Sequence, residues 1–280
     1  MAASPTAQRR RLGRMLRSLR EAANLNGEEA AAAAERSASW LSRIESGQAV
    51  LRLRELRDLL NHYRMDDPDR RAALERMATE GRERDWWTGY TDKLDPLFGR
   101  FVGLEAVASE ILTFEDHAIP GLLQSPRYMQ TLIRLAVPKP QPEVTEATIE
   151  FRTRRQGILH DEQRPHFVVI LDEAVLHRRM GGQEVMREQF AFLLDAIDRG
   201  LVEFRILATT QERMPLHAFT ILRFEDDPAV AHLDTLSGGV LEEGHTAIET
   251  YETIFAYLRT IAHDPPASRR VIQAMKEAHG

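Results

Sequence analysis

The sequence contains no cysteine, which excludes disulfides, zinc sites built from thiolates and cysteine nucleophiles. It also lacks any apolar run close to the roughly 18 residues that a helix needs to span a bilayer. The basic N-terminal stretch MAASPTAQRRRLGR is not followed by an apolar segment, so no secretory signal is expected. These absences favour a cytoplasmic protein that does not contact membranes.

The motifs HExxH, GxSxG and GxGxxG and the P-loop lysine are absent too. Asp172, Glu173 and His177 lie close together, and His245 and Glu249 form an HxxxE pattern. Neither group has a third metal ligand at a recognisable spacing, and isolated His–Glu pairs are usually surface salt bridges. We therefore predict no catalytic activity, no metal and no cofactor, with an enzymatic body as the weaker alternative.

What the sequence does contain is an uneven distribution of charge. The chain of 280 residues has a net charge of −6 and a length that fits about two domains. Residues 1–64 carry 12 Lys/Arg and 7 Asp/Glu, a balance of +5, which leaves −11 for the remainder. A basic head on an acidic body indicates that the head meets a polyanion and the body does not.

The spacing of apolar residues predicts four short helices in the head, at 8–23, 28–34, 37–46 and 52–63. In the third, Ser37 is a good N-cap, Gly47 suits the position after the last turn, and Leu41 and Ile44 face inward. Two short helices joined by a tight turn form the helix-turn-helix plan, in which the second helix enters the major groove of DNA. The alternative is a four-helix cap with solvated serines.

The outer side of the third helix carries small and polar residues. We predict that Arg43, Ser39 and Ser42 read bases, and that Ala38 permits close approach. Ser37 caps the helix, Trp40 is expected mainly to pack, and three arginines are expected to meet phosphates. The predicted DNA-contacting set is Arg36, Ser37, Ala38, Ser39, Trp40, Ser42, Arg43, Arg52 and Arg54.

The stretch LGRMLRSLREAANLNGEEAAAAAERSASWLSRIESG resembles the Xre-type, lambda-repressor-like helix-turn-helix, most strongly at LREAANL, EE and LSRIESG. It departs from that pattern where Glu35 replaces the usual glycine of the turn, Arg36 the usual apolar residue and Gly27 the usual glutamine. A left-handed backbone at Glu35 would cost about 1 kcal/mol.

The middle of the chain combines aromatic residues with a Pro-Gly break. Trp86, Trp87 and Tyr90 are expected to pack a helical junction over residues 70–95. We predict a helix from residue 105 to a break at 120–121, followed by a second helix. The side chains of Leu122, Leu123 and Tyr128 in this corner either anchor a partner protein or close the core.

The rest of the body alternates helix and strand. Residues 138–146 are expected to form an exposed loop and residues 148–160 a helix. HFVVILD is a predicted strand that runs into a helix ending at Gly181–Gly182, and VEFRILA, AFTILRF and VAHLDTL are further strands. Further helices are expected near residues 184–199, 246–262 and 266–278. This order indicates an α+β domain with a small mixed sheet flanked by helices.

Several segments of the body, above all IPGLLQSPRY and LDEAVLHRRMGGQEVMREQFAFLL, are similar to one large C-terminal domain. That domain follows this helix-turn-helix in many actinomycete regulators, including the WhiJ-like ones, and is antitoxin-like and of unknown function. The resemblance implies a transcriptional regulator paired with a small protein encoded nearby, with no known catalysis.

Together these observations predict a lambda-repressor-like, all-α head at residues 1–69, a helical junction at 70–95 and an α+β body at 96–280. The expected function is sequence-specific binding of double-stranded DNA in the cytoplasm, at the nucleoid, by a homodimer whose body joins the chains or receives the small protein partner. The alternatives are an antitoxin-like protein that mainly sequesters its partner, and a ligand-sensing regulator.

Overall fold

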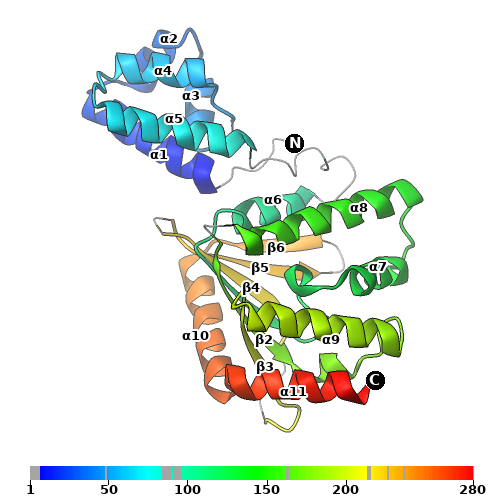
Figure 1. Ribbon diagram of the computed structural model, residues 1–280. Helices are drawn as coiled ribbons and strands as arrows, with labels where there is room; N and C mark the ends of the chain where they lie inside the picture. The colour runs from blue at the N-terminus through cyan, green and yellow to red at the C-terminus, as the bar shows by residue number, and fades with distance from the viewer. Residues whose placement is uncertain are drawn as a thin grey trace. The chain divides into compact units, whose positions relative to one another are not determined.

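The computed structural model describes residues 7–47, 49–83, 90, 96–161, 164–212, 216–225, 227–235 and 238–279. The chain divides into two compact units, a head that contains the first five helices and a body that contains everything from Ala108 onward (Figure 1). The predicted junction residues Trp86 and Trp87 lie outside the described residues.

The head is a bundle of short helices: α1 (Ala7–Ala22), α2 (Gly27–Ala33), α3 (Ala38–Glu45), α4 (Leu53–His62) and α5 (Pro68–Glu83). The first four were predicted to within one residue at each end. Their inward side chains, among them Leu16, Leu41 and Leu56, form one buried hydrophobic cluster. Helix α5 begins the segment predicted as a junction, yet it packs against α1 and α4 and adds Leu74 and Ala78 to the same cluster.

The body is built on a six-stranded sheet in the order β3-β2-β1-β4-β5-β6. Its strands are β1 (Glu110–Glu115), β2 (His166–Asp172), β3 (Glu203–Leu207), β4 (Phe219–Arg223), β5 (Val230–Thr235) and β6 (Gly238–Glu242). The first three strands are parallel, and β4, β5 and β6 are paired antiparallel. The expected small mixed sheet flanked by helices is thereby confirmed.

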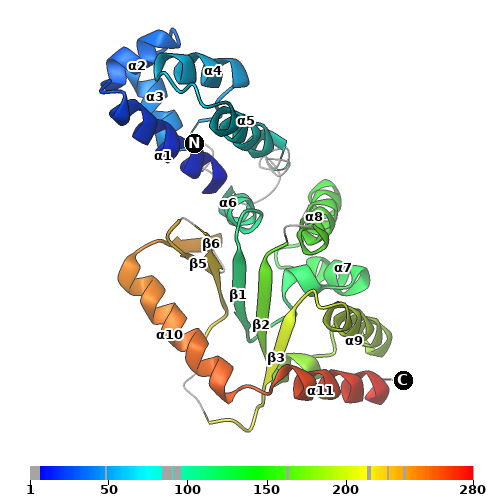
Figure 2. The same ribbon diagram turned by 60° about the vertical axis from the view of Figure 1, so that its left-hand side comes forward.

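Helices cover both faces of this sheet (Figure 2). On one face, α10 (His245–Ile261) packs Phe255 and Leu258 against Phe114 of β1 and Phe219 of β4. Figure 2 shows α7 (Pro126–Leu135), α8 (Pro142–Arg155) and α9 (Gln183–Asp198) on the other face. Helix α11 (Pro265–Ala278) packs against α9 and β3.

Three local predictions for the body were wrong. The segment after α6 (Pro96–Glu105) forms β1, where a helix was expected to continue to the Pro-Gly break. The expected loop at 138–146 already contains the start of α8, because proline fits the first turn of a helix. The helix expected after β2 is a short 3-10 turn, η4 (Glu173–His177), because Asp172 accepts a hydrogen bond from the Ala174 amide and directs a tight turn.

Candidate nucleic-acid interface

Helix α3 has the two ends that the sequence predicts. The Ser37 hydroxyl oxygen accepts a hydrogen bond from the Trp40 amide at 3.2 Å, which caps the N-terminus. At the other end, Gly47 has φ of 75°, the left-handed conformation that ends many helices. Leu41 and Ile44 are buried in the head at 1% and 2% exposure. These contacts fix both the length of α3 and its rotation about its own axis.

The opposite side of α3 is open to solvent. Ala38, Ser39, Ser42 and Arg43 are all exposed. Among the described residues, the hydroxyls of Ser39 and Ser42 have no hydrogen-bond partner, and Arg43 Nε donates only a long 3.4 Å bond to the Ser39 carbonyl. Trp40 is partly buried and packs on the hydrophobic cluster of the head. The exposed face of α3 therefore carries small or polar side chains and one basic side chain, that of Arg43.

The turn before α3 is strained at Glu35. This residue has φ of 54°, in the left-handed region that usually selects glycine. Its amide bonds to the Ala32 carbonyl at 3.0 Å, and the next amide, of Arg36, bonds to the Ala31 carbonyl at 2.9 Å. These bonds close the end of α2 and hold the turn in the conformation that the sequence comparison anticipated.

Glu55 connects this turn to α4, a role that the sequence analysis missed. Its Oε1 accepts from Arg36 at 2.8 Å, and its Oε2 accepts from the Arg52 amide at 3.0 Å, which caps α4. Glu55 is 9% exposed, whereas 46% of the Arg36 side chain remains exposed. Arg52 and Arg54 lie exposed at the start of α4. The spacing Arg52-x-x-Glu55 was the available signal, but the first residue is not the serine or threonine of a capping box.

A second ion pair fixes α3 to α1. Arg20 Nε and Nη2 donate to the two carboxylate oxygens of Glu45 at 2.6 and 3.1 Å, and Arg20 Nη1 donates to the Leu25 carbonyl at 2.8 Å. Both side chains are nearly buried, at 12% and 11% exposure. The hydrogen bond with Glu45 raises the pKa of Arg20 above its usual value, so the pair stays charged.

Comparison with protein families matches two separate parts of the chain. A model described as a helix-turn-helix domain matches residues 11–74, from α1 into α5. A model described as a domain of unknown function, DUF5753, matches residues 98–274, more than half of the chain. The chain belongs to the DUF5753 family. No curated protein and no solved structure matches it, and among the described residues no helix is long and apolar enough to cross a membrane.

In the DUF5753 domain, the Pro-Gly corner is part of the core. Leu122 is 2% exposed, and both Leu123 and Tyr128 are fully buried. This is the second of the two roles that the sequence left open, so these residues are not at the surface for a partner to contact. Gln189 holds the corner from α9, because its amide donates to the Leu123 carbonyl and its oxygen accepts from the Ser125 amide, both at 2.7 Å.

The His–Glu patterns of the DUF5753 domain have structural partners. Glu173 accepts from the Thr209 amide at 2.9 Å, which joins the ends of β2 and β3. His245 and Glu249 form an exposed pair 3.3 Å apart. No group of three or more potential metal ligands occurs among the described residues.

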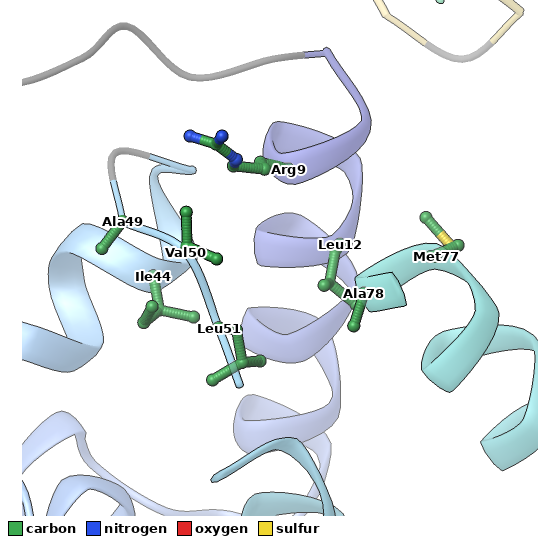
Figure 3. Close-up of a pocket in the computed structure, with 8 residues that line it drawn as sticks. All are labelled: Arg9, Leu12, Ile44, Ala49, Val50, Leu51, Met77 and Ala78. Carbon is green, nitrogen blue, oxygen red and sulfur yellow. The ribbon is translucent and has the colours of Figure 1, made fainter. Parts of the chain in front are cut away.

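One small apolar pocket lies in the head, between α1, α5 and the chain after α3 (Figure 3). Leu12, Ile44, Leu51 and Ala78 line it, and its volume of about 20 Å³ suits no more than a water molecule. Arg9 lies at its edge, and burial lowers the pKa of its guanidinium. This pocket is too small to hold an effector.

Proposed function

We propose that this chain is a sequence-specific DNA-binding transcriptional regulator and that α3 enters the major groove. The observation that carries the proposal is the exposed face of α3, where two serine hydroxyls have no hydrogen-bond partner among the described residues. The helix itself is fixed by caps and by two ion pairs. A helix fixed in this way presents hydrogen-bonding groups to base edges at a smaller entropic cost than a mobile segment would. The helix-turn-helix match over residues 11–74 supports the same function.

The proposed contacts divide into two kinds. Arg43, Ser39 and Ser42 read base edges, while Ala38 leaves room for the backbone to approach. Arg52, Arg54 and the exposed part of Arg36 contact phosphates, which position the head but carry no sequence information. Arg36 therefore has two roles in this proposal, because its pairing with Glu55 aims the guanidinium that a phosphate would meet.

Arg43→Ala is expected to weaken binding to the operator by about 1–3 kcal/mol, the range for losing one good base contact. Binding to random DNA is expected to change much less, because Arg43 is proposed to read a base. Fluorescence anisotropy with an operator duplex, located by genomic footprinting, and with a random duplex at one salt concentration measures both. An unchanged ratio of the two affinities would contradict base reading by Arg43.

Two further variants make this comparison specific. Arg52→Ala is expected to weaken binding to both duplexes and to flatten the salt dependence by about one counterion. Arg57→Ala removes the same charge from the same helix, but Arg57 pairs with Glu75 at 2.7 Å and has no proposed DNA contact. It should leave both affinities almost unchanged, and equal losses for Arg52 and Arg57 would indicate a general charge effect.

We further propose that two chains act together, joined through their bodies. One head reads only a few base pairs, and such heads usually work as pairs on half-sites about one helical turn apart. Residues 108–280 carry 18 Lys/Arg and 26 Asp/Glu, and this negative balance of −8 keeps the body away from DNA. The footprint should therefore show two half-sites; a single half-site, bound by a chain that light scattering shows to be monomeric, would contradict the pairing.

The alternative of a protein that mainly sequesters a small partner has less support. Its candidate anchors were Leu122, Leu123 and Tyr128, and all three are buried. The DNA-binding function rests on exposed residues, so we prefer it.

A further inference from the structure

A polar strip crosses the otherwise apolar sheet of the body. Thr113 of β1, Thr220 of β4 and His232 of β5 lie side by side in the register, and the two threonine hydroxyls are 3.0 Å apart. All three are at most 8% exposed. Strands β1 and β5 run in the same direction, so Glu115 and Asp234, each two residues further on, point to the same face.

This face is the one opposite α10, and Figure 2 shows α8 on that side of the sheet. Two arginines of α8 complete the cluster, because the charge of Arg155 acts on Glu115 and that of Asp234 acts on Arg152. Arg155 lies 5.3 Å from the centre of the Phe98 ring, close to the Gly121 backbone. A methyl group on Gly121 would come within 2.9 Å of Arg155 Nη1, so the absence of a side chain there makes room for the guanidinium. We call Glu115, Arg152, Arg155, His232 and Asp234 the polar cluster.

Among the described residues, Arg152 has no hydrogen-bond partner, and its Nε is buried. Burial, and then the neighbouring charge of Arg155, lower the pKa of Arg152, while the carboxylate of Asp234 opposes this change. Arginine is almost never buried unless it is paired, because an unpaired buried cation is costly. Among the described residues, the charge of Asp234 reaches Arg152 but no acceptor forms a hydrogen bond with it, so the guanidinium can still take an anionic ligand.

Glu115 is a carboxyl group of the polar cluster with a raised pKa. Burial, with the nearby carboxylates of Asp234 and Asp116, raises its pKa to about 8, so it holds a proton at neutral pH. Its side chain is 18% exposed, whereas that of Asp234 is 68% exposed, so the cluster opens to solvent beside Asp234. The two carboxyl groups can accept hydrogen bonds from a donor group of a ligand, while the neighbouring arginine can donate to an anionic group of the same ligand.

We propose that the polar cluster binds a small zwitterion of the amino acid class. Arg152 and Arg155 take its carboxylate, the Asp234 carboxylate pairs with its ammonium group, and the carbonyl oxygen of the protonated Glu115 accepts a further hydrogen bond from that group. The site lies wholly in the body and does not depend on DNA binding by the head. It would give the body the ability to respond to a metabolite.

Thermal unfolding of the full chain tests this with defined probes. The panel is the twenty proteinogenic amino acids, with acetate and inorganic phosphate as anions alone and ethanolamine as a cation. At about tenfold excess over its Kd, an amino acid should raise the Tm by about 3 °C. Acetate, phosphate and ethanolamine should each give less. No shift with any amino acid, or an equal shift with acetate or phosphate, would overturn the proposal.

Variants of α8 separate binding from folding. Arg152→Gln should abolish the shift, while the Tm without ligand stays the same or rises because an unpaired buried charge is removed. Arg154→Gln, which changes an exposed arginine of the same helix, should retain the full shift. A fall in the unliganded Tm of Arg152→Gln would show that Arg152 stabilises the fold instead. A shift that survives in Arg152→Gln would exclude the cluster as the binding site.

Discussion

Arg20→Ala is expected to lower the free energy of unfolding of the head by about 2–4 kcal/mol. Arg20 joins three parts of the head, because it lies on α1, pairs with Glu45 of α3 through two hydrogen bonds, and donates to the Leu25 carbonyl before α2. Truncation leaves the Glu45 carboxylate, 11% exposed, without its partner. The loss is therefore that of an uncompensated, largely buried charge, together with a missing donor to Leu25.

Arg17→Ala is the matched control for this change. Arg17 lies one turn away on α1 and pairs with Glu21 at 2.9 Å, but the two side chains are 64% and 56% exposed. Exposed pairs of this spacing contribute about 0.3–0.5 kcal/mol. Urea unfolding followed by hydrogen exchange of the α1 and α3 amides reports on the head separately from the body. If both variants lower the free energy of unfolding of the head equally, the Arg20–Glu45 pair stabilises the head no more than an exposed ion pair does.

Gly13→Ala is expected to destabilise the head by about 1–2 kcal/mol and to displace α3. Gly13 is a buried residue of α1, and a methyl group there would come within 2.5 Å of the Ile44 carbonyl oxygen and 2.7 Å of the Glu45 carbonyl carbon. These are backbone atoms of α3, which cannot rotate away as a flexible side chain can. Overpacking of this kind costs about 1–3 kcal/mol, which exceeds the gain of up to about 1 kcal/mol from replacing glycine by alanine in a helix.

Gly27→Ala provides the comparison, because no atom lies within 4 Å of a methyl group added there. It should leave the head as stable as before or slightly more stable. The operator affinity of Gly13→Ala should also fall, since displacement of α3 moves Ser39, Ser42 and Arg43 together. If hydrogen exchange of the α3 amides is unchanged in Gly13→Ala, then α1 and α3 can move apart without any loss of stability, which would contradict this prediction.

Much of the head could be predicted because its signals are local. The caps Ser37 and Gly47 lie at the ends of the helix they define, and Leu41 and Ile44 share a face at a spacing of three residues. Residues this close in the chain meet in any helix, so their spacing alone gives the bounds of α3 and the face that points outward. The predicted set on that face, including Ser39, Ser42 and Arg43, is exposed for the same reason.

The sequence predicted the α+β fold class of the body but not all of its elements, and β1 shows why. EILTFE has residues that suit a helix or a strand, and it becomes an interior strand of the sheet because β2 and β4 supply hydrogen bonds on both sides. Glu110 pairs with residues that lie 56 and 113 positions further along the chain, so no local pattern predicts these partners.

Pairing between distant side chains was the other feature that only the tertiary structure decided. Arg36 and Glu55 are 19 residues apart, and Arg20 and Glu45 are 25 apart. Arg152 gave no signal in the sequence, because its lack of a hydrogen-bond partner among the described residues follows from where α8 packs. The sequence of Leu122 and Tyr128 fits a surface or a core equally well, and packing against α8 and α9 places both in the core. Spacing along the chain determines which residues share a face, and only packing determines what that face meets.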